Sequence, residues 1–175
     1  MTDPAPGGVP LRTLNAEELL AVASLWKRTG REFVTRFRGV SMQPAIPDSA
    51  AVRLRCADDV DLGDVVAYAV GQQVIVHRIV ARWNDRFLTR GDGNVLPDAI
   101  LPERNGVIGK VTAVELEGDW NPPGHPPSSL AGALLLRICS LVAAVAGPRV
   151  AGRLLRILHR VRQSVRGPRG SSAER

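Results

Sequence analysis

The sequence predicts a mainly β protein, in which a compact, antiparallel, barrel-like domain lies between a short N-terminal helix and a C-terminal helical segment. Two observations lead to this prediction. Between residues 38 and 118, short apolar runs alternate with turn-forming Gly, Asp and Asn residues, which is typical of an antiparallel β domain. After residue 127 the chain becomes a long apolar run and then an arginine-rich stretch, which favours helices.

Shifts in composition divide the chain into five expected segments. Residues 1–36 are expected to form a tail and an amphipathic helix, and residues 37–120 the β domain. Residues 121–127 hold four prolines, which suit neither a helix interior nor a strand ladder, so an extended linker is expected. Residues 128–166 are expected to form hydrophobic and then basic amphipathic helices, and residues 167–175 a disordered tail.

A capping box predicts the N-terminal helix over residues 15–29. Asn15 can accept a hydrogen bond from the backbone N–H of Glu18, and the Glu18 side chain can reach back to Asn15. Leu14 and Leu19 are placed as a hydrophobic staple, and Gly30 can end the helix. We expect this helix to cover one side of the β domain.

Five strands are predicted from period-two alternation and from the turn residues that bound them. They are expected at residues 51–56, 64–70, 73–81, 86–90 and 107–116. Gly71 and Gln72 form a plausible hairpin turn between the second and third of these strands. Gly109 lies inside the last strand and predicts a bulge or a close backbone approach.

The net charge of +6 is unevenly distributed. Residues 126–175 hold nine Arg and one Glu, a net charge of +8, whereas the other 125 residues hold 14 Lys or Arg and 16 Asp or Glu, a net charge of −2. A slightly acidic main body argues against a nucleic-acid partner. The basic C-terminal part is instead expected to meet something anionic, such as lipid headgroups.

The C-terminal part also raises the question of a membrane. Residues 130–147 are apolar apart from Arg137 and Ser140, and at 18 residues they are only marginally long enough to span a bilayer. Four arginines then recur on one helix face: Arg149, Arg153, Arg156 and Arg160. We expect residues 130–158 to contact a membrane; the alternative is a helical hairpin packed on the main domain or on a partner.

The sequence leaves two cellular locations open. The first 40 residues lack the pattern of a secretory signal peptide, which favours the cytoplasm or the cytoplasmic face of the membrane. The alternative is a single-pass protein whose arginine-rich C-terminus lies in the cytoplasm.

The two cysteines are expected to be small hydrophobic residues rather than ligands. Cys56 and Cys139 lie far apart and form no Cys-x-x-Cys motif or Cys/His cluster, although a single bridge between them stays open. No metal ion or cofactor is predicted.

Four polar residues stand out by their surroundings. Ser41 lies in an irregular Gly-Val-Ser-Met-Gln-Pro stretch, and His77 interrupts an apolar strand. Asp92 and Asp98 flank the turn after the fourth predicted strand. Each residue alone is more typical of a turn or a core position, but together they supply a nucleophile, a base and a carboxylate that can orient the base.

The flanks of these residues resemble the signal peptidase I superfamily, which also includes the self-cleaving SOS-repressor-type proteases. Five motifs occur in the order of that superfamily and cover roughly residues 37–116. They are Gly-x-Ser-Met-x-Pro at 39–44, Leu-Gly-Asp-Val-Val at 62–66, His-Arg-Ile-Val at 77–80, Leu-Thr-Arg-Gly-Asp-Gly-Asn at 88–94 and Val-Ile-Gly-Lys-Val at 107–111.

The resemblance is to the Ser–His branch, found in archaeal, endoplasmic-reticulum and sporulation-type signal peptidases. Members of the other branch carry a lysine where this chain has His77, and Lys110 lies in a different motif. In the Ser–His branch an aspartate six residues beyond the Gly-Asp aspartate assists the histidine. Counting from Asp92 gives Asp98, which is present.

The resemblance implies a role for each motif residue. Ser41 would attack a peptide carbonyl, His77 would take its proton, and Asp98 would orient His77 while Asp92 holds the loop or supports the same network. The backbone N–H of Ser41 would contribute to the oxyanion hole, in which Gly39 replaces the serine of many bacterial relatives. Met42, with Gly39 and Pro44, is expected to line the cleft for an extended substrate with small residues at the cleavage site.

The resulting expectation is a serine endopeptidase that cleaves a leader or signal-like segment of a peptide or protein precursor. One alternative is a self-cleaving repressor-like regulator, although the N-terminal helix is too short for a helix-turn-helix domain and the main body is not basic. The other alternative is an inactive binding module of the same fold.

Overall fold

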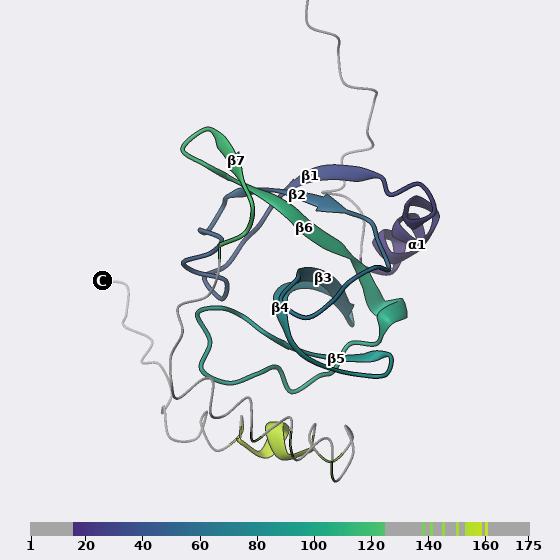
Figure 1. The fold of residues 1–175 in the computed structure, drawn as a ribbon, viewed down its shortest axis with the longest axis vertical. Coiled ribbons are helices and arrows are strands. Elements are labelled where there is room, and N and C mark those ends of the chain that lie inside the picture. Colours follow the sequence, from purple (N-terminus) through teal and green to yellow (C-terminus); the bar gives the residue numbers. More distant parts are fainter. Residues whose placement is uncertain are drawn as a thin grey trace, which may run out of the picture.

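The computed structural model describes residues 16–124 and, in the C-terminal part, residues 138, 141, 145, 150, 153–158 and 160. The predicted capping residue Asn15, residues 125–127 of the predicted linker, most of the apolar run and the predicted tail at 167–175 lie outside the described residues. Figure 1 shows the elements: α1 (Ala16–Lys27), β1 (Glu32–Arg36), β2 (Ala51–Arg55), β3 (Val65–Val70), β4 (Gln73–Trp83), β5 (Arg86–Arg90), the 3₁₀ helix η2 (Arg104–Gly106), β6 (Val107–Leu116) and β7 (Asp119–Asn121).

The strands form one seven-stranded antiparallel sheet, which confirms the mainly β prediction. Its order is β1-β2-β6-β3-β4-β5, and β7 pairs with β6. In the described part of the chain no pairing joins β1 to β5, so the sheet is not closed and a barrel is not confirmed. The short helix α1 lies beside the β1-β2-β6 part of the sheet (Figure 1) and packs against β6 and β3.

All five predicted strands are present, with ends that differ from the prediction by two residues or fewer. The sequence did not predict β1 or β7. Strand β1 has a mixed, half-exposed sequence, Glu-Phe-Val-Thr-Arg, and pairs only with β2; β7 has three exposed residues and pairs only with β6. Such short edge strands bury little apolar surface, so their local sequence carries little β signal.

Gly109 makes the close backbone approach that its position in the sequence predicts. A Cβ added at Gly109 would lie 2.2 Å from the carbonyl oxygen of Arg55 on the neighbouring strand β2. The pairing of β6 with its other neighbour β3 also shifts register between Ala67 and Tyr68. Any larger side chain at residue 109 would therefore separate the two central strands, β2 and β6.

The main hydrophobic cluster fixes the loop that contains Ser41. Residues from α1, β2, β3 and β6 form this cluster, and the loop between β1 and β2 contributes Met42 and Ile46, both fully buried. A second cluster joins Tyr68 on β3 to Ile79 on β4 and Phe87 on β5. The first cluster therefore supports the loop of Ser41, and the second supports strands β3, β4 and β5 on the other side of the predicted site.

None of the helices within the described residues is long and apolar enough to cross a bilayer. Residues 153–158 are helical and lie below β5 in Figure 1. The predicted membrane contact of residues 130–158 falls largely on residues outside the described ones and stays a prediction.

Candidate active site

The β1–β2 loop presents Ser41 on a turn that is anchored at both ends. Near its start, the backbone N–H of Phe37 donates to the carbonyl oxygen of Ala50 at 2.9 Å. The N–H of Gly39, whose φ of +125° favours glycine, donates to Asp48 Oδ1 at 2.7 Å. Met42, the residue that follows Ser41, is buried in the core. This packing holds Ser41 at a defined position, while Ser41 itself remains partly exposed.

This geometry differs from the expectation that Met42 lines the substrate cleft, and it limits the role of Gly39. Met42 is fully buried, so its side chain anchors the loop and does not line an open cleft. Gly39 is exposed, but its N–H is already bound to Asp48, so this group is not available as a donor to an oxyanion. Pro44 is exposed on the same loop, two residues before the buried Ile46.

Ser41, His77 and Asp98 come together in one line of hydrogen bonds. Ser41 Oγ lies 3.1 Å from His77 Nε2, and His77 Nδ1 lies 2.6 Å from Asp98 Oδ2. An ionised carboxylate can only accept, so Nδ1 is the donor toward Asp98. In the neutral imidazole, Nε2 is then the acceptor that faces the serine hydroxyl, which is the arrangement a general base requires.

The loop after β5 packs directly against the serine turn. The N–H of Gly93 donates to the carbonyl oxygen of Ser41 at 2.9 Å, and the N–H of Asp98 donates to the carbonyl oxygen of Thr89 at 2.8 Å. A Cβ added at Gly91 would lie 2.5 Å from the Ser41 carbonyl oxygen and 2.9 Å from His77 Nε2. Glycine at residue 91 is therefore what allows the two loops to approach.

Tyr68 is a fourth side chain of the site, and the sequence reading missed it. Its hydroxyl donates to Asp98 Oδ2 at 3.1 Å and lies 2.9 Å from Thr89 Oγ1. Burial, and then the charge of Asp98, raise the pKa of Tyr68 above its usual value, so the phenol keeps its proton. Since that proton points to Asp98, the Thr89 hydroxyl donates to Tyr68. The chain has a single tyrosine, and its position in an otherwise aliphatic strand was the available signal.

Asp92 lies apart from the His77 line and pairs with a buried arginine. Arg78 Nε and Nη2 donate to the two carboxylate oxygens of Asp92 at 3.0 and 2.7 Å. Arg78 also donates to the carbonyl oxygens of Gly63 at 2.8 Å and Gly124 at 2.5 Å. Of the two roles expected for Asp92, these contacts support holding the loop, whereas Asp98 is the carboxylate next to His77.

Replacing Asp92 by alanine is expected to lower the free energy of unfolding by about 3–5 kcal/mol, because the Arg78 guanidinium would be left buried without its carboxylate. The Asp92 side chain is 1% exposed and that of Arg78 is 8% exposed. Urea unfolding would measure the change. Asp59→Ala is the matched control: its carboxylate is 71% exposed and pairs with Arg55, so its loss is expected to cost less than about 1 kcal/mol. Equal effects of the two substitutions would contradict the prediction.

Neither of the two lysines of the chain is placed to act on Ser41. Lys27 Nζ lies 2.7 Å from Asp58, and Lys110 Nζ lies 3.6 Å from Asp64. Lys110 is two strands away from His77, because Val66 on β3 pairs with His77 on one side and Lys110 on the other. The basic side chain that contacts Ser41 Oγ in the described structure is His77.

Within the residues that the structure describes, neither a reactive thiol nor a metal-binding group is found beside this site. Cys56 is fully buried, and burial raises the pKa of its thiol to about 11, so it is a poor nucleophile. Cys139 lies outside the described residues, so a bridge between the two cysteines stays open. Within residues 16–124 and the described C-terminal positions, no three His, Cys, Asp or Glu side chains are grouped to hold a metal ion.

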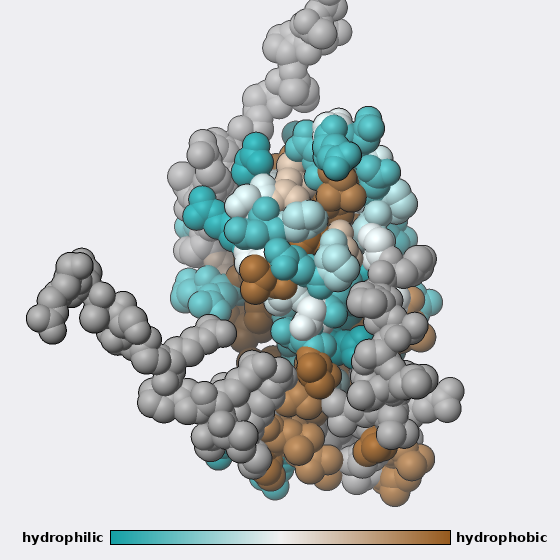
Figure 2. Space-filling view, turned by 90° about the vertical axis from the view of Figure 1, so that its left-hand side faces the viewer, coloured by the Kyte–Doolittle hydropathy of each residue, from teal (hydrophilic) through white to brown (hydrophobic). Residues whose placement is uncertain are grey.

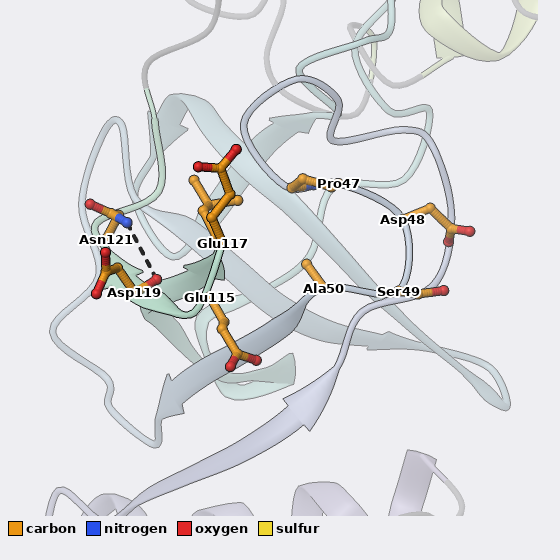
Figure 3. A pocket seen from close by; sticks show the side chains of 9 residues that line it. Pro47, Asp48, Ser49, Ala50, Glu115, Glu117, Asp119 and Asn121 are labelled. Carbon is orange, nitrogen blue, oxygen red and sulfur yellow. Dashed lines mark hydrogen bonds between the residues drawn. The ribbon is translucent and has the colours of Figure 1, made fainter.

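A pocket of about 690 Å³ lies away from the serine, between the loop at residues 47–50 and the β6–β7 hairpin (Figure 3). Its lining is acidic: Asp48, Glu115, Glu117 and Asp119. Ser41, His77 and Asp98 do not line it. The pocket is connected to the site through Asp48, which accepts the hydrogen bond from Gly39 at the start of the serine turn.

In the comparison with protein families, the family model described as Peptidase S24-like matches residues 5–112. The matched range contains Ser41, His77 and Asp98. No curated protein and no solved structure matches the chain significantly.

Proposed function

The chain belongs to the Peptidase S24-like family, and on this basis we propose that it is a serine endopeptidase in which Ser41 is the nucleophile and His77 the base. Membership of this family supports peptidase activity in general. The observation that carries the assignment of residues is the line of contacts from Ser41 Oγ through His77 to Asp98, at 3.1 and 2.6 Å.

In the first half of the proposed reaction, Ser41 Oγ attacks the carbonyl carbon of the scissile peptide bond while its proton moves to His77 Nε2. The imidazolium that forms is stabilised by Asp98 and then gives its proton to the leaving amine. In the second half, His77 takes a proton from a water molecule as the water oxygen attacks the ester carbonyl carbon; the bond between that carbon and Ser41 Oγ then breaks, His77 returns its proton to Oγ, and the carboxylic acid product leaves. Tyr68 would hold the Asp98 carboxylate against His77 by donating to the same oxygen.

The backbone N–H of Ser41 is the proposed oxyanion donor. Loss of one such donor typically costs a factor of about 10²–10³ in turnover. Gly39 cannot be the second donor in this conformation, because Asp48 binds its N–H.

We further propose that the protein belongs to the Ser–His branch of the wider superfamily. Both lysines are held in ion pairs away from the serine, so a lysine base would require Lys27 or Lys110 to leave its carboxylate partners. His77 needs no such rearrangement, since it already contacts Ser41 Oγ.

The proposed substrate is an extended leader or signal-like segment of a peptide or protein precursor, with small residues before the cut. Two exposed valines lie in the two loops that meet at Ser41: Val40 precedes Ser41 and is 67% exposed, and Val95 lies two residues after Gly93, whose N–H binds the Ser41 carbonyl, and is 56% exposed. Their apolar side chains suit an uncharged, extended segment. A self-cleaving regulator is the second candidate, because the same serine chemistry can act on the chain itself.

The test compares the purified full chain with Ser41→Ala on peptides that have small residues before the cut. We expect cleavage of added peptide and labelling by a fluorophosphonate probe, with at least a 10³-fold loss of cleavage in Ser41→Ala. Ser24→Ala is the matched control, because Ser24 is an exposed α1 residue bonded only to the Ala21 carbonyl oxygen in the described structure.

Mass spectrometry of the incubated chain separates the alternatives. Shortening that depends on Ser41, without cleavage of added peptides, would favour the self-cleaving regulator. Absence of cleavage, self-cleavage and probe labelling would contradict both and leave a binding module.

A further inference from the structure

Among the described C-terminal helical residues, Leu155 packs onto the sheet. Leu155 is 1% exposed and packs in a cluster with Ala81 on β4 and Leu88 on β5. Ala99 and Leu101, from the segment after Asp98, pack against the same cluster. Figure 1 shows residues 153–158 running below β5. One side of this helical segment therefore faces the protein.

A second side of the C-terminal segment carries exposed aliphatic residues. Figure 2 shows apolar side chains gathered at the lower end of the molecule, where Figure 1 places this segment. The exposed residues form two groups, each at helical spacings: Ile138, Leu141 and Val145, and then Val150, Leu154 and Ile157. Val145 is 82% and Leu141 66% exposed. Single exposed apolar residues are ordinary, but Val150, Leu154 and Ile157 lie at positions i, i+4 and i+7 and share one helix face, which marks an interaction surface.

A third side of the C-terminal segment carries positively charged arginine side chains. With 100° per residue, Arg153 lies about 65° and Arg156 about 125° from the centre of the stripe formed by Val150, Leu154 and Ile157. On the other side of that stripe, Leu155 lies about 130° from its centre. Arg153 and Arg156 are both exposed. Arg153 thus borders the apolar stripe on the side away from Leu155, and Arg156 lies further round the helix, between Arg153 and Leu155.

We propose that this face binds the surface of an anionic lipid bilayer. Aliphatic residues can enter the region between headgroups and acyl chains, while arginines at the border of the stripe bind lipid phosphates. Residues 126–175 carry a net charge of +8, which adds attraction to an anionic surface. The proposal goes beyond the peptidase assignment and does not depend on it.

Charge complementarity is what favours a bilayer over a protein groove. A helix that docks into a protein groove buries its apolar stripe and leaves its cations in water, so it needs no particular charge beside the stripe. Here Leu155 already occupies the protein-facing side, and the open side combines an apolar stripe with adjacent arginines. A lipid surface satisfies both groups at once. The bound bilayer would then lie beside β4 and β5, and β4 carries His77.

The experiment is flotation of the purified full chain with vesicles. We expect binding to vesicles of phosphatidylcholine mixed with phosphatidylglycerol and at least tenfold weaker binding to phosphatidylcholine alone. Arg153→Gln/Arg156→Gln should weaken binding to the anionic vesicles by about tenfold or more. The control is Arg28→Gln/Arg38→Gln, which removes the same charge from exposed residues elsewhere and should have a much smaller effect.

A second pair of variants tests the apolar stripe. Ile157→Glu should abolish flotation, whereas Leu25→Glu, at a comparably exposed position on α1, should not. All four variants replace exposed side chains, and circular dichroism with peptide cleavage would show that each is folded. Equal binding to both kinds of vesicle, no binding, or an unchanged Ile157→Glu would overturn the proposal. So would light scattering that shows a dimer of the full chain which Ile157→Glu converts to monomer, because a second copy would then cover the stripe.

Discussion

Replacing Asp98 by asparagine is expected to lower kcat by a factor of about 10⁴ while leaving the fold intact. The asparagine amide can donate to Nδ1 of His77, which favours the tautomer with the proton on Nε2. That nitrogen could then no longer accept the proton of Ser41 Oγ, from which it lies 3.1 Å. The measurement is kcat on a cleaved peptide, together with the unfolding midpoint.

Asp59→Asn provides the control for the Asp98 substitution, since it makes the same chemical change at an exposed carboxylate. Its kcat is expected to match that of the unmodified protein. Full activity of Asp98→Asn would show that His77 is oriented by other groups. A loss of activity that merely follows a loss of folded protein would show that Asp98 acts on stability and not on His77.

Gly91→Ala is the second substitution with a large expected effect. The added methyl would meet Ser41 O at 2.5 Å, Asn94 Nδ2 at 2.8 Å and His77 Nε2 at 2.9 Å. The loops must therefore separate by a substantial fraction of an ångström, and a displacement of about 1 Å at reacting groups can cost 10²-fold in rate. We expect at least that loss in kcat/KM and reduced labelling of Ser41 by a fluorophosphonate probe.

Gly106→Ala is matched to Gly91→Ala, because a Cβ at residue 106 meets nothing within 4 Å. Its kcat/KM and probe labelling should stay within a factor of about two of the unmodified protein, as for a surface substitution remote from the site. Equal activity of the two alanine variants would mean that the loops at residues 41 and 91 are not held together in solution.

The site was more predictable from sequence than the contacts that support it. Ser41, His77 and Asp98 each lie in or near a short motif, and the structure places their side chains in one hydrogen-bonded line. Tyr68 was not predicted, because its contact with Asp98 spans 30 residues and depends on how β3 pairs with β4. Local pattern gives the face of a strand but not its neighbour across the sheet.

Met42 shows a different limit of sequence reasoning. A methionine after the serine suggests an apolar contact with substrate, yet the chain turns so that Met42 enters the main cluster with Ile46 and Phe37. The direction of a side chain in an irregular loop depends on the backbone of that loop, for which no repeating pattern exists. The five predicted strands, β2 to β6, have regular patterns, and their ends were predicted to within two residues.

The contacts of Arg78 also set how short an independently expressed version of the protein can be. The family match ends at residue 112, but one guanidinium N–H of Arg78 donates to Gly124, which lies after β7. Ending the chain at residue 112 would remove that acceptor, the end of β6 and all of β7. The acceptor comes from a part of the chain that no catalytic motif covers. The shortest truncation that keeps every described contact of Arg78 and Asp92 therefore ends no earlier than Gly124.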